Sequence, residues 1–166
     1  DTYKQIKSDS IAIYRERGSK FIAYAYIVNS KKQIKEKLDF IKKSEKSAHH
    51  YCYAYVLNPD KSDFRTYDDG EPSSTAGKPI LGQIKSNDLT NILIIVVRYF
   101  GGTKLGIQGL IRSYKTAASD AISKVKIITK IIYDKYQFFF KYSELNQVMK
   151  IVKDCKLDVQ KTDFDI

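Results

Sequence analysis

The sequence predicts an α+β protein, in which β-strands and amphipathic helices follow one another along the chain. Residues 10–15 and 20–28 alternate in polarity and are rich in aromatic and β-branched residues, which is typical of paired strands. Residues 31–46 place apolar side chains at helical spacing beneath a face of Lys and Glu. The apolar run 91–97 is too short to cross a membrane and is β-branched, which indicates a buried strand.

Turn and capping residues mark the boundaries of the elements in the first half of the chain. Residues 17–19 (RGS) separate the first two strands, so we expect a hairpin. Ser30 precedes the helical segment and is a suitable N-cap. Residues 50–57 and 64–67 are two further predicted strands.

The strand at residues 91–100 ends in a glycine turn that opens a basic helix. Gly101 and Gly102 break the strand, Lys104 follows, and a helical pattern begins near Gly106. Exposed backbone N–H groups and the helix dipole favour an anion at such a helix start. The spacing matches neither a phosphate-binding P-loop nor the dinucleotide-binding pattern. A tight turn that only lets the helix pack closely against the sheet is the alternative interpretation.

The helix after this turn separates apolar from cationic side chains. The apolar residues expected to face inward are Leu105, Leu110, Tyr114 and Ala118. Near one exposed stripe fall Lys104, Gln108, Arg112 and Lys115. Packing does not require the cationic side chains of this stripe, which starts at the positive end of the helix dipole. We therefore expect a bound anion to meet both the helix start and these cations.

Three carboxylates lie close together in the sequence at Asp68, Asp69 and Glu71, in the loop before a helix predicted through residues 80–85. They are able to chelate a divalent cation or to act as an acid/base pair. Ordinary turn chemistry, with an Asp bonded to the backbone of its own loop, is the alternative. A helix through residues 80–85 follows, and we expect its cap among residues 73–75 (SST).

Two histidines and a cysteine near residue 50 raise the question of a metal site. His49, His50 and Cys52 do not have zinc-site spacing, and Cys155 is the only other cysteine in the sequence. We predict no metal and no other cofactor. Cys52 is expected in the core, and His50 at a strand end facing a site. Both cysteines are expected to be reduced thiols in a cytoplasmic protein.

The formal net charge of +10 is concentrated in two regions. Residues 1–48 carry 12 Lys and Arg against 6 acidic residues, largely on the predicted helix 31–46, where a solvated face is sufficient explanation. Residues 91–127 carry 6 against 1, and this excess coincides with the helix start. A basic surface suits RNA, the ribosome or an acidic protein partner, and charge alone does not choose among them.

The pattern restarts in the last quarter of the chain. Residues 133–142 and 157–163 are predicted strands, and residues 143–155 form a capped amphipathic helix. We therefore expect two domains, residues 1–127 and a partial second domain at residues 128–166. No apolar run is long enough for a membrane span, and the first residues do not have the pattern of a signal peptide.

Several short motifs, in this order along the chain, resemble the YigZ/IMPACT family. They are residues 18–23 (GSKFIA), 50–54 (HYCYA), 68–73 (DDGEPS), 76–81 (AGKPIL), 98–106 (RYFGGTKLG) and 109–112 (GLIR). Ser74 and Gln108 stand where the family usually has Gly, and both reduce backbone freedom.

The resemblance implies both a fold and a role. Residues 1–127 should form a two-layer α/β sandwich like the second domain of a small-subunit ribosomal protein. Residues 128–166 should begin a ferredoxin-like domain similar to the last domain of elongation factor G. The eukaryotic branch of the family regulates translation by binding the scaffold that activates an initiation-factor kinase. For the bacterial branch, nucleic-acid binding is the usual suggestion.

The first functional hypothesis is a cytoplasmic, translation-associated binding module rather than an enzyme. The expected anion or nucleic-acid contacts are Arg98, Gly101, Gly102, Lys104, Arg112 and Lys115. The expected supporting residues are His50, Asp68, Asp69 and Glu71. The partner is RNA, the ribosome or an acidic protein, no membrane is involved, and the oligomeric state stays open.

The second hypothesis is an enzyme acting on a small phosphorylated or nucleotide ligand. Asp69 or Glu71 would hold a metal or act as a base, His50 would move a proton, and Lys104 would bind phosphate. A pocket that brings these groups together would favour it. A protein–protein adaptor without a nucleic-acid role is the third possibility.

Overall fold

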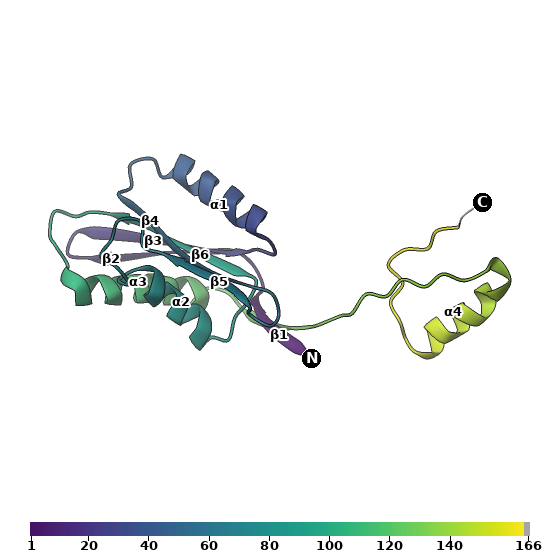
Figure 1. Ribbon diagram of the computed structural model, residues 1–166. Helices are drawn as coiled ribbons and strands as arrows, with labels where there is room; N and C mark the ends of the chain where they lie inside the picture. Colours follow the sequence, from purple (N-terminus) through teal and green to yellow (C-terminus); the bar gives the residue numbers. More distant parts are fainter. Residues whose placement is uncertain (165–166) are drawn as a thin grey trace. The chain divides into compact units, whose positions relative to one another are not determined.

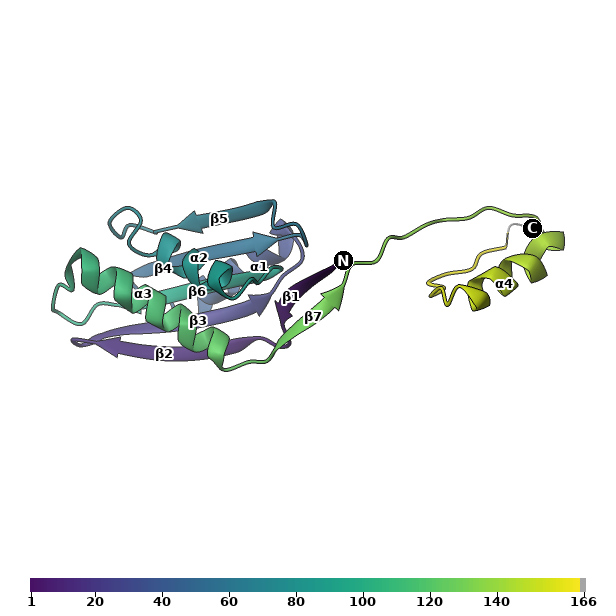
Figure 2. The ribbon, with the colours of Figure 1, turned by 90° about the horizontal axis from the view of Figure 1, so that it is seen from below.

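The computed structural model describes residues 1–164 and shows two compact units, Asp1–Ile132 and Tyr133–Ile166. The first unit contains a five-stranded antiparallel sheet in the order β2-β3-β6-β4-β5 (Figure 2). Its strands are β2 (Ser10–Glu16), β3 (Ser19–Ile27), β4 (His50–Leu57), β5 (Asp63–Tyr67) and β6 (Ile92–Tyr99). A separate antiparallel pair joins β1 (Thr2–Ile6) to β7 (Ile127–Ile131).

Helices cover both faces of the five-stranded sheet. Figure 1 shows α1 (Lys31–Ser44) on one side, and α2 (Gly77–Ser86) with α3 (Gly106–Ser123) on the other. The first unit is therefore a three-layer sandwich, and the expectation of two layers is wrong. The physical reason is β6, whose residues from Ile92 to Arg98 are buried on both faces and need cover on each side.

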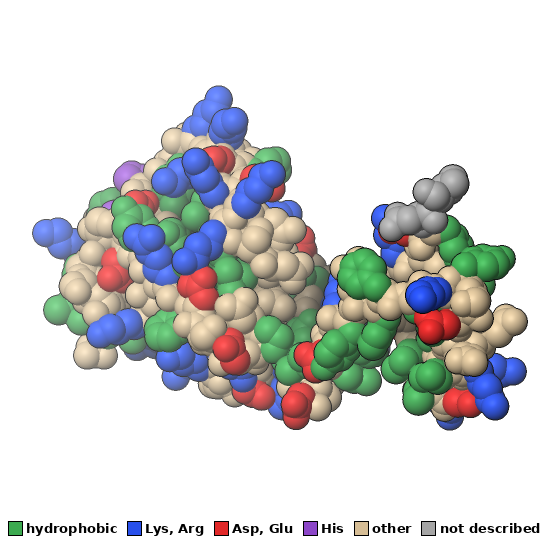
Figure 3. All heavy atoms as spheres, turned by 45° about the vertical axis from the view of Figure 1, so that its right-hand side comes forward, with side chains coloured by type: hydrophobic (Ala, Val, Ile, Leu, Met, Phe, Trp, Pro, Cys, Tyr) green, Lys and Arg blue, Asp and Glu red, His purple; other side chains and the backbone are tan. Residues whose placement is uncertain are grey.

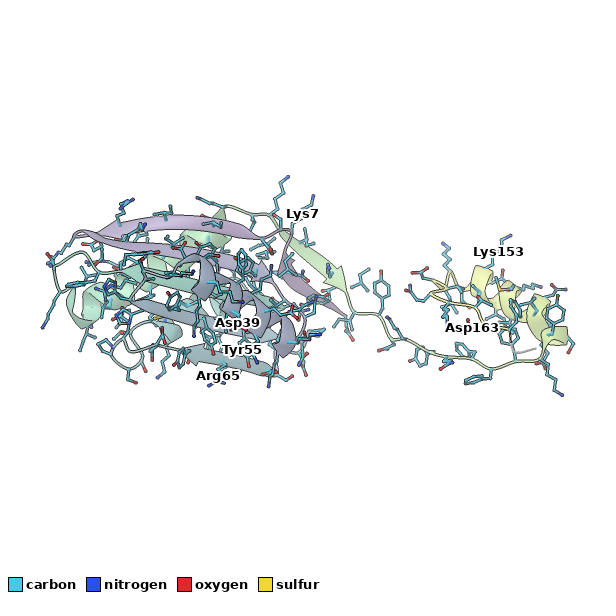
Figure 4. The ribbon with its side chains drawn as sticks, turned by 90° about the horizontal axis from the view of Figure 1, so that it is seen from above. Lys7, Asp39, Tyr55, Arg65, Lys153 and Asp163 are labelled. Atoms are coloured by element: carbon cyan, nitrogen blue, oxygen red, sulfur yellow. The ribbon has the colours of Figure 1, made fainter. Side chains whose placement is uncertain are left out.

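The two faces of the sheet use side chains of different size. The α2/α3 face carries small residues, among them Ala23, Ala25, Cys52 and Ala54, so these helices pack near the strands. On the α1 face the sheet instead presents tyrosines, including Tyr24, Tyr26 and Tyr55. Tyr55 pairs across the sheet with Arg65 of β5 (Figure 4). Large aromatic rings fill the space beneath a single helix, which accounts for much of the tyrosine content.

Three predictions in the first half of the chain are confirmed: a hairpin turn, a helix N-cap and a strand. Arg17 and Gly18 form the two-residue hairpin between β2 and β3, with positive φ angles of 44° and 81°. Ser30 caps α1, since its hydroxyl accepts from the Gln33 amide over 3.3 Å. The strand predicted at residues 50–57 matches β4 at both ends.

In the second unit, the predicted helix is present but the predicted strands are not. Helix α4 (Leu145–Asp154) follows a short 3₁₀ turn at Tyr142–Glu144. Residues 133–141 and 157–164 adopt no regular structure, so the prediction of strands there is wrong. A strand forms only where a neighbour accepts its backbone hydrogen bonds, and no described segment offers that pairing here. Residues 127–131 pair with β1 within the first unit.

Candidate anion-binding pocket

Several of the predicted site residues meet at one end of the five-stranded sheet. His50 begins β4 and lies directly opposite Arg98, near the end of β6, in the antiparallel register. Because Arg98 shares the strand face of Ile94 and Val96, it points toward α2 and α3. The loop that carries Glu71 crosses this end of the sheet, and α3 begins beside it.

Arg98 is the buried half of an ion pair rather than part of an exposed cationic surface. Its Nη1 donates to Glu71 Oε1 over 2.6 Å, and the two side chains are only 6% and 4% exposed. The Tyr114 hydroxyl of α3 donates to the same oxygen over 2.7 Å. The guanidinium also lies against the rings of Phe21 and Phe100, 5.5 and 5.7 Å from their centroids. Arg98 therefore does not share the exposed stripe with Lys104.

Asp68 organises the loop before α2 through its carboxylate. One oxygen accepts from the amides of Ala76 and Gly77 over 3.1 and 2.8 Å, and the other accepts from Ser74 over 2.9 Å. Asp68 thus binds the free backbone donors at the start of α2. The expected cap among residues 73–75 is wrong, because none of their side chains bonds to the helix start. A carboxylate eight residues upstream outcompetes them.

Asp69 ties the same loop to the start of β4. Its carboxylate accepts from the Tyr51 amide over 2.7 Å, and its carbonyl oxygen lies 2.8 Å from Nδ1 of His50. Asp69 has a positive φ angle of 43° and is followed by Gly70 at 82°. Asp68 and Asp69 are therefore both engaged in holding the loop, as the structural interpretation of this acidic segment predicts.

Cys52 lies behind the Arg98–Glu71 pair in the core. Its thiol is within 3.0 Å of the Asp68 carbonyl oxygen and 3.3 Å of the Tyr114 hydroxyl. Burial raises the pKa of the Cys52 thiol, so the protonated form is favoured and the thiol is a poor nucleophile. Burial also raises the pKa of Tyr114, which keeps its hydroxyl available as a donor to Glu71.

In the glycine turn after β6, one glycine packs against a neighbouring backbone and the next has open space around it. A side-chain carbon on Gly101 would lie 2.0 Å from the carbonyl carbon of Gly18, so the two backbones pass in close contact. The Gly101 amide donates to the Ser19 hydroxyl over 3.2 Å and is not available to a ligand. Gly102 is exposed with a positive φ angle of 85°, and no atom of the part of the chain that the structure describes lies within 4 Å of its position for a side chain.

Among the described residues 1–164, no side chain is seen to accept a hydrogen bond from the first amides of helix α3. The residue before it, Leu105, makes no capping hydrogen bond, and its first turn contains no acidic residue. Lys104 is exposed immediately ahead of this start. A helix amino end with uncapped N–H groups and a neighbouring cation favours an anion.

The remaining cations of the predicted stripe lie further along α3. Arg112 and Lys115 are both exposed. A hydrogen bond to Glu16 raises the pKa of the Tyr14 hydroxyl of β2, whereas the charge of Arg112 opposes that rise. Arg112 and Lys115 lie further along α3 from its start than Lys104 does. Figure 3 shows one face of the molecule, where further Lys and Arg side chains gather at the top over α1.

A pocket of about 350 Å³ lies between the acidic loop, the end of β6 and the start of α3. The polar residues that line it are His50, Glu71, Arg98 and Lys104, and the others are Pro72, Phe100, Leu105, Gly106, Ile107 and Leu110. Four residues proposed from the sequence thus come together, with His50 Nε2 3.9 Å from Glu71 Oε1. Asp69 does not line the pocket.

Among the pocket residues that the sequence did not predict as part of the site, Phe100 and Ile107 are large exposed apolar side chains. Phe100 follows the strand directly and is 44% exposed, and Ile107 sits in the first turn of α3 and is 60% exposed. Their sequence signal is an apolar side chain outside the inward-facing set of the helix. That signal is weak, because single exposed apolar residues are common on protein surfaces.

The site and fold together define a three-layer α+β protein with a cationic, partly apolar pocket at a helix amino end. The Impact N-terminal domain model matches residues 17–122, which include every residue of this pocket. The chain belongs to the IMPACT family.

Relatives of known sequence and structure agree with this assignment. IMPACT family member YvyE of Bacillus subtilis is 36% identical over 129 residues, which are 78% of this chain and 58% of that protein. IMPACT family member YigZ of Escherichia coli is 29% identical over 150 residues, 89% of this chain and 74% of that protein. This chain therefore spans less than two thirds of the YvyE length.

A crystal structure of a hypothetical protein superposes with a TM-score of 0.82 at 26% identity, covering 99% of this chain and 81% of that one. The α+β fold with antiparallel sheets is thereby shown. Among residues 1–164, none of the helices has both the length and the apolar character needed to cross a membrane.

Proposed function

We propose that this chain is a cytoplasmic, translation-associated binding protein that contacts RNA through Gly102, Lys104 and the amino end of α3. The observation that carries the proposal is the start of α3, where an exposed lysine precedes uncapped amides and no acidic residue follows in the first turn. Such a start attracts phosphate groups. Membership of the IMPACT family supports a role in translation, because the eukaryotic branch regulates it.

The residues predicted from the sequence divide into contacts and supports. Lys104, Arg112 and Lys115 would contact phosphates, because their charges are exposed and Lys104 adjoins the helix start. Arg98 and Gly101 would act as supports, because one is neutralised by Glu71 and the other is packed on Gly18. Asp68, Asp69 and His50 would hold the loop that forms the opposite wall.

The test is binding of a labelled single-stranded RNA at several salt concentrations. Binding through phosphates releases counterions, so affinity should fall steeply and linearly on a logarithmic salt scale. Lys104→Gln should reduce the slope by about one, the change expected when one phosphate contact is lost. Lys43→Gln is the matched control, because Lys43 is exposed on α1 on the other face of the sheet. Binding without salt dependence, or no binding, would refute the proposal.

An acidic protein partner is the rival binding role. Capture of partners from a lysate with and without nuclease separates the two, since capture through RNA is lost after nuclease treatment. If the captured partners remain bound after nuclease treatment and purified RNA does not bind, the partner is a protein and not RNA.

An enzyme acting on a small phosphorylated ligand is the second candidate, because His50, Glu71 and Lys104 line one pocket. His50 would move the proton, and Lys104 would hold the phosphate. The test incubates the protein with a panel of nucleotides and uses phosphorus NMR to detect any phosphate that is released. Turnover that is lost in His50→Ala and absent from the buffer control would support it.

We also propose a fold relationship for each of the two units. The sheet of the first unit with α2 and α3, apart from the added layer of α1, would share the fold of the second domain of a small-subunit ribosomal protein, and residues 128–166 would begin a ferredoxin-like domain. A structure of the protein on a ribosomal subunit would test both relationships. It would also show whether the second unit contributes to the contact surface.

A further inference from the structure

Two large apolar side chains at the pocket are exposed to solvent. Phe100 is 44% exposed and Ile107 is 60% exposed, and both line the pocket beside Lys104. The core of the first unit closes without them, since neither belongs to its two buried clusters. An aromatic ring next to a cation and a helix amino end is a surface on which a flat ring with an attached anion can bind.

The size and lining of the pocket limit the ligand. About 350 Å³ is near the lower end of small-ligand clefts, which is room for one base with its sugar but not for several bases. One side of the Phe100 ring faces the Arg98 guanidinium, 5.7 Å from its centroid. The opposite side of the ring is the one on which a base would stack.

We propose that this pocket binds one nucleotide of single-stranded RNA, with its base against Phe100 and Ile107 and its phosphate at Lys104 and the start of α3. This inference rests on the proposed RNA-binding function and adds that a base, and not only the phosphate chain, is recognised. Single-stranded RNA is commonly bound by such a combination of stacking and cations.

The test compares oligomers with and without bases on the whole chain. Fluorescence anisotropy is measured with a labelled single-stranded RNA and with an abasic sugar–phosphate oligomer of equal length and charge. Phe100→Ala should weaken RNA binding by roughly 5- to 150-fold, the range for loss of one base–aromatic stack. The salt slope should stay unchanged in this variant, because no phosphate contact is lost.

Three controls separate stacking from unfolding. Phe100→Tyr keeps the ring and should restore binding. Phe40→Ala removes an aromatic residue that is 60% exposed on α1, and should leave binding unchanged. Thermal melts of each variant show whether the fold is retained. The abasic oligomer should bind the unsubstituted protein about as weakly as RNA binds Phe100→Ala.

The outcomes separate this inference from the proposed function. Equal binding of the abasic and base-bearing oligomers, with steep salt dependence, would overturn the base pocket and leave phosphate binding in place. No RNA binding at low salt would overturn both. Competition by a free nucleoside monophosphate as strong as that by the oligomer would overturn RNA as the source and assign the pocket to a free nucleotide.

Discussion

The Arg98 guanidinium donates to Glu71 Oε1 over 2.6 Å, with 6% and 4% of the two side chains exposed. The pair joins the end of β6 to the loop before α2, and Tyr114 brings in α3 through the same oxygen. A charge pair in the interior holds these elements in one geometry, because neither partner tolerates separation from the other. The wall of the pocket therefore depends on it.

Glu71→Ala is expected to lower the free energy of unfolding by about 3–5 kcal/mol, because the Arg98 charge would stay buried without its partner. Unfolding in urea, followed by circular dichroism, measures the change. Glu36→Ala on the exposed face of α1 is the control and should change little. Replacing both partners, as in Arg98→Met with Glu71→Leu, should recover much of the lost stability.

A loss of less than about 1 kcal/mol in Glu71→Ala would contradict this picture, since that is the range of exposed pairs. In that case the pair would be hydrated in solution. The assignment of Arg98 as a buried support, rather than a ligand contact, would then fail.

Gly101→Ala is expected to destabilise the protein by about 1–3 kcal/mol or more, because the added carbon would overlap the Gly18 backbone. Gly82→Ala is the matched control. Gly82 lies inside α2, and no atom is found within 4 Å of its position for a side chain. Its replacement should stabilise the helix by about 0.5–1 kcal/mol. Thermal melts of both variants test this difference. Equal changes in melting temperature would contradict the close contact between Gly101 and Gly18.

The close approach of Gly101 to Gly18 shows what sequence reasoning lacked. The hairpin at Arg17 and Gly18 was predictable, because its turn signal lies within four residues. The function of Gly101 was not, because its neighbour is more than eighty positions away in the chain. The sequence does show a break after β6, but it does not show that one glycine faces a backbone and the next faces solvent.

Arg98 illustrates the same limit for the candidate site. Alternation along β6 puts Arg98 on the face of Ile94 and Val96, so its direction was available from the sequence. Its burial depends on Glu71, which reaches it from a loop 27 residues earlier. The strand predicted at residues 133–142 is absent for a related reason, because an aromatic composition does not supply a neighbouring strand to pair with.

Asp68→Ala is expected to destabilise the protein by about 1–2 kcal/mol, the range for loss of a helix cap. The side chain accepts from three backbone amides, and those of Ala76 and Gly77 begin α2. Hydrogen exchange of these two amides should accelerate. Ser73→Ala is the control, because Ser73 is exposed and does not bond to the helix start. A larger effect in Ser73→Ala than in Asp68→Ala would restore a serine cap.

Stability is expected to fall in acid through Glu45, the C-cap residue that follows α1. Burial opposes its ionisation, but hydrogen bonds from the hydroxyls of Tyr24 and Tyr99, with the charge of Lys20, outweigh that effect and lower the pKa of Glu45 below its ordinary value of 4.5. The folded state thus prefers the ionised carboxylate. Its contribution is present above the unfolded pKa and is lost as the pH falls through the folded pKa.

Glu45→Gln should therefore destabilise the protein at neutral pH and have a progressively smaller effect below about pH 4.5, the value for an unperturbed Glu. Urea unfolding at several pH values gives the difference between the two proteins at each pH. Glu36→Gln, exposed on the same helix, is the control for a general charge effect. A difference that stays constant from neutral to acid pH would show that the tyrosines hold Glu45 by packing alone, since a protonated carboxyl would then serve as well as the carboxylate.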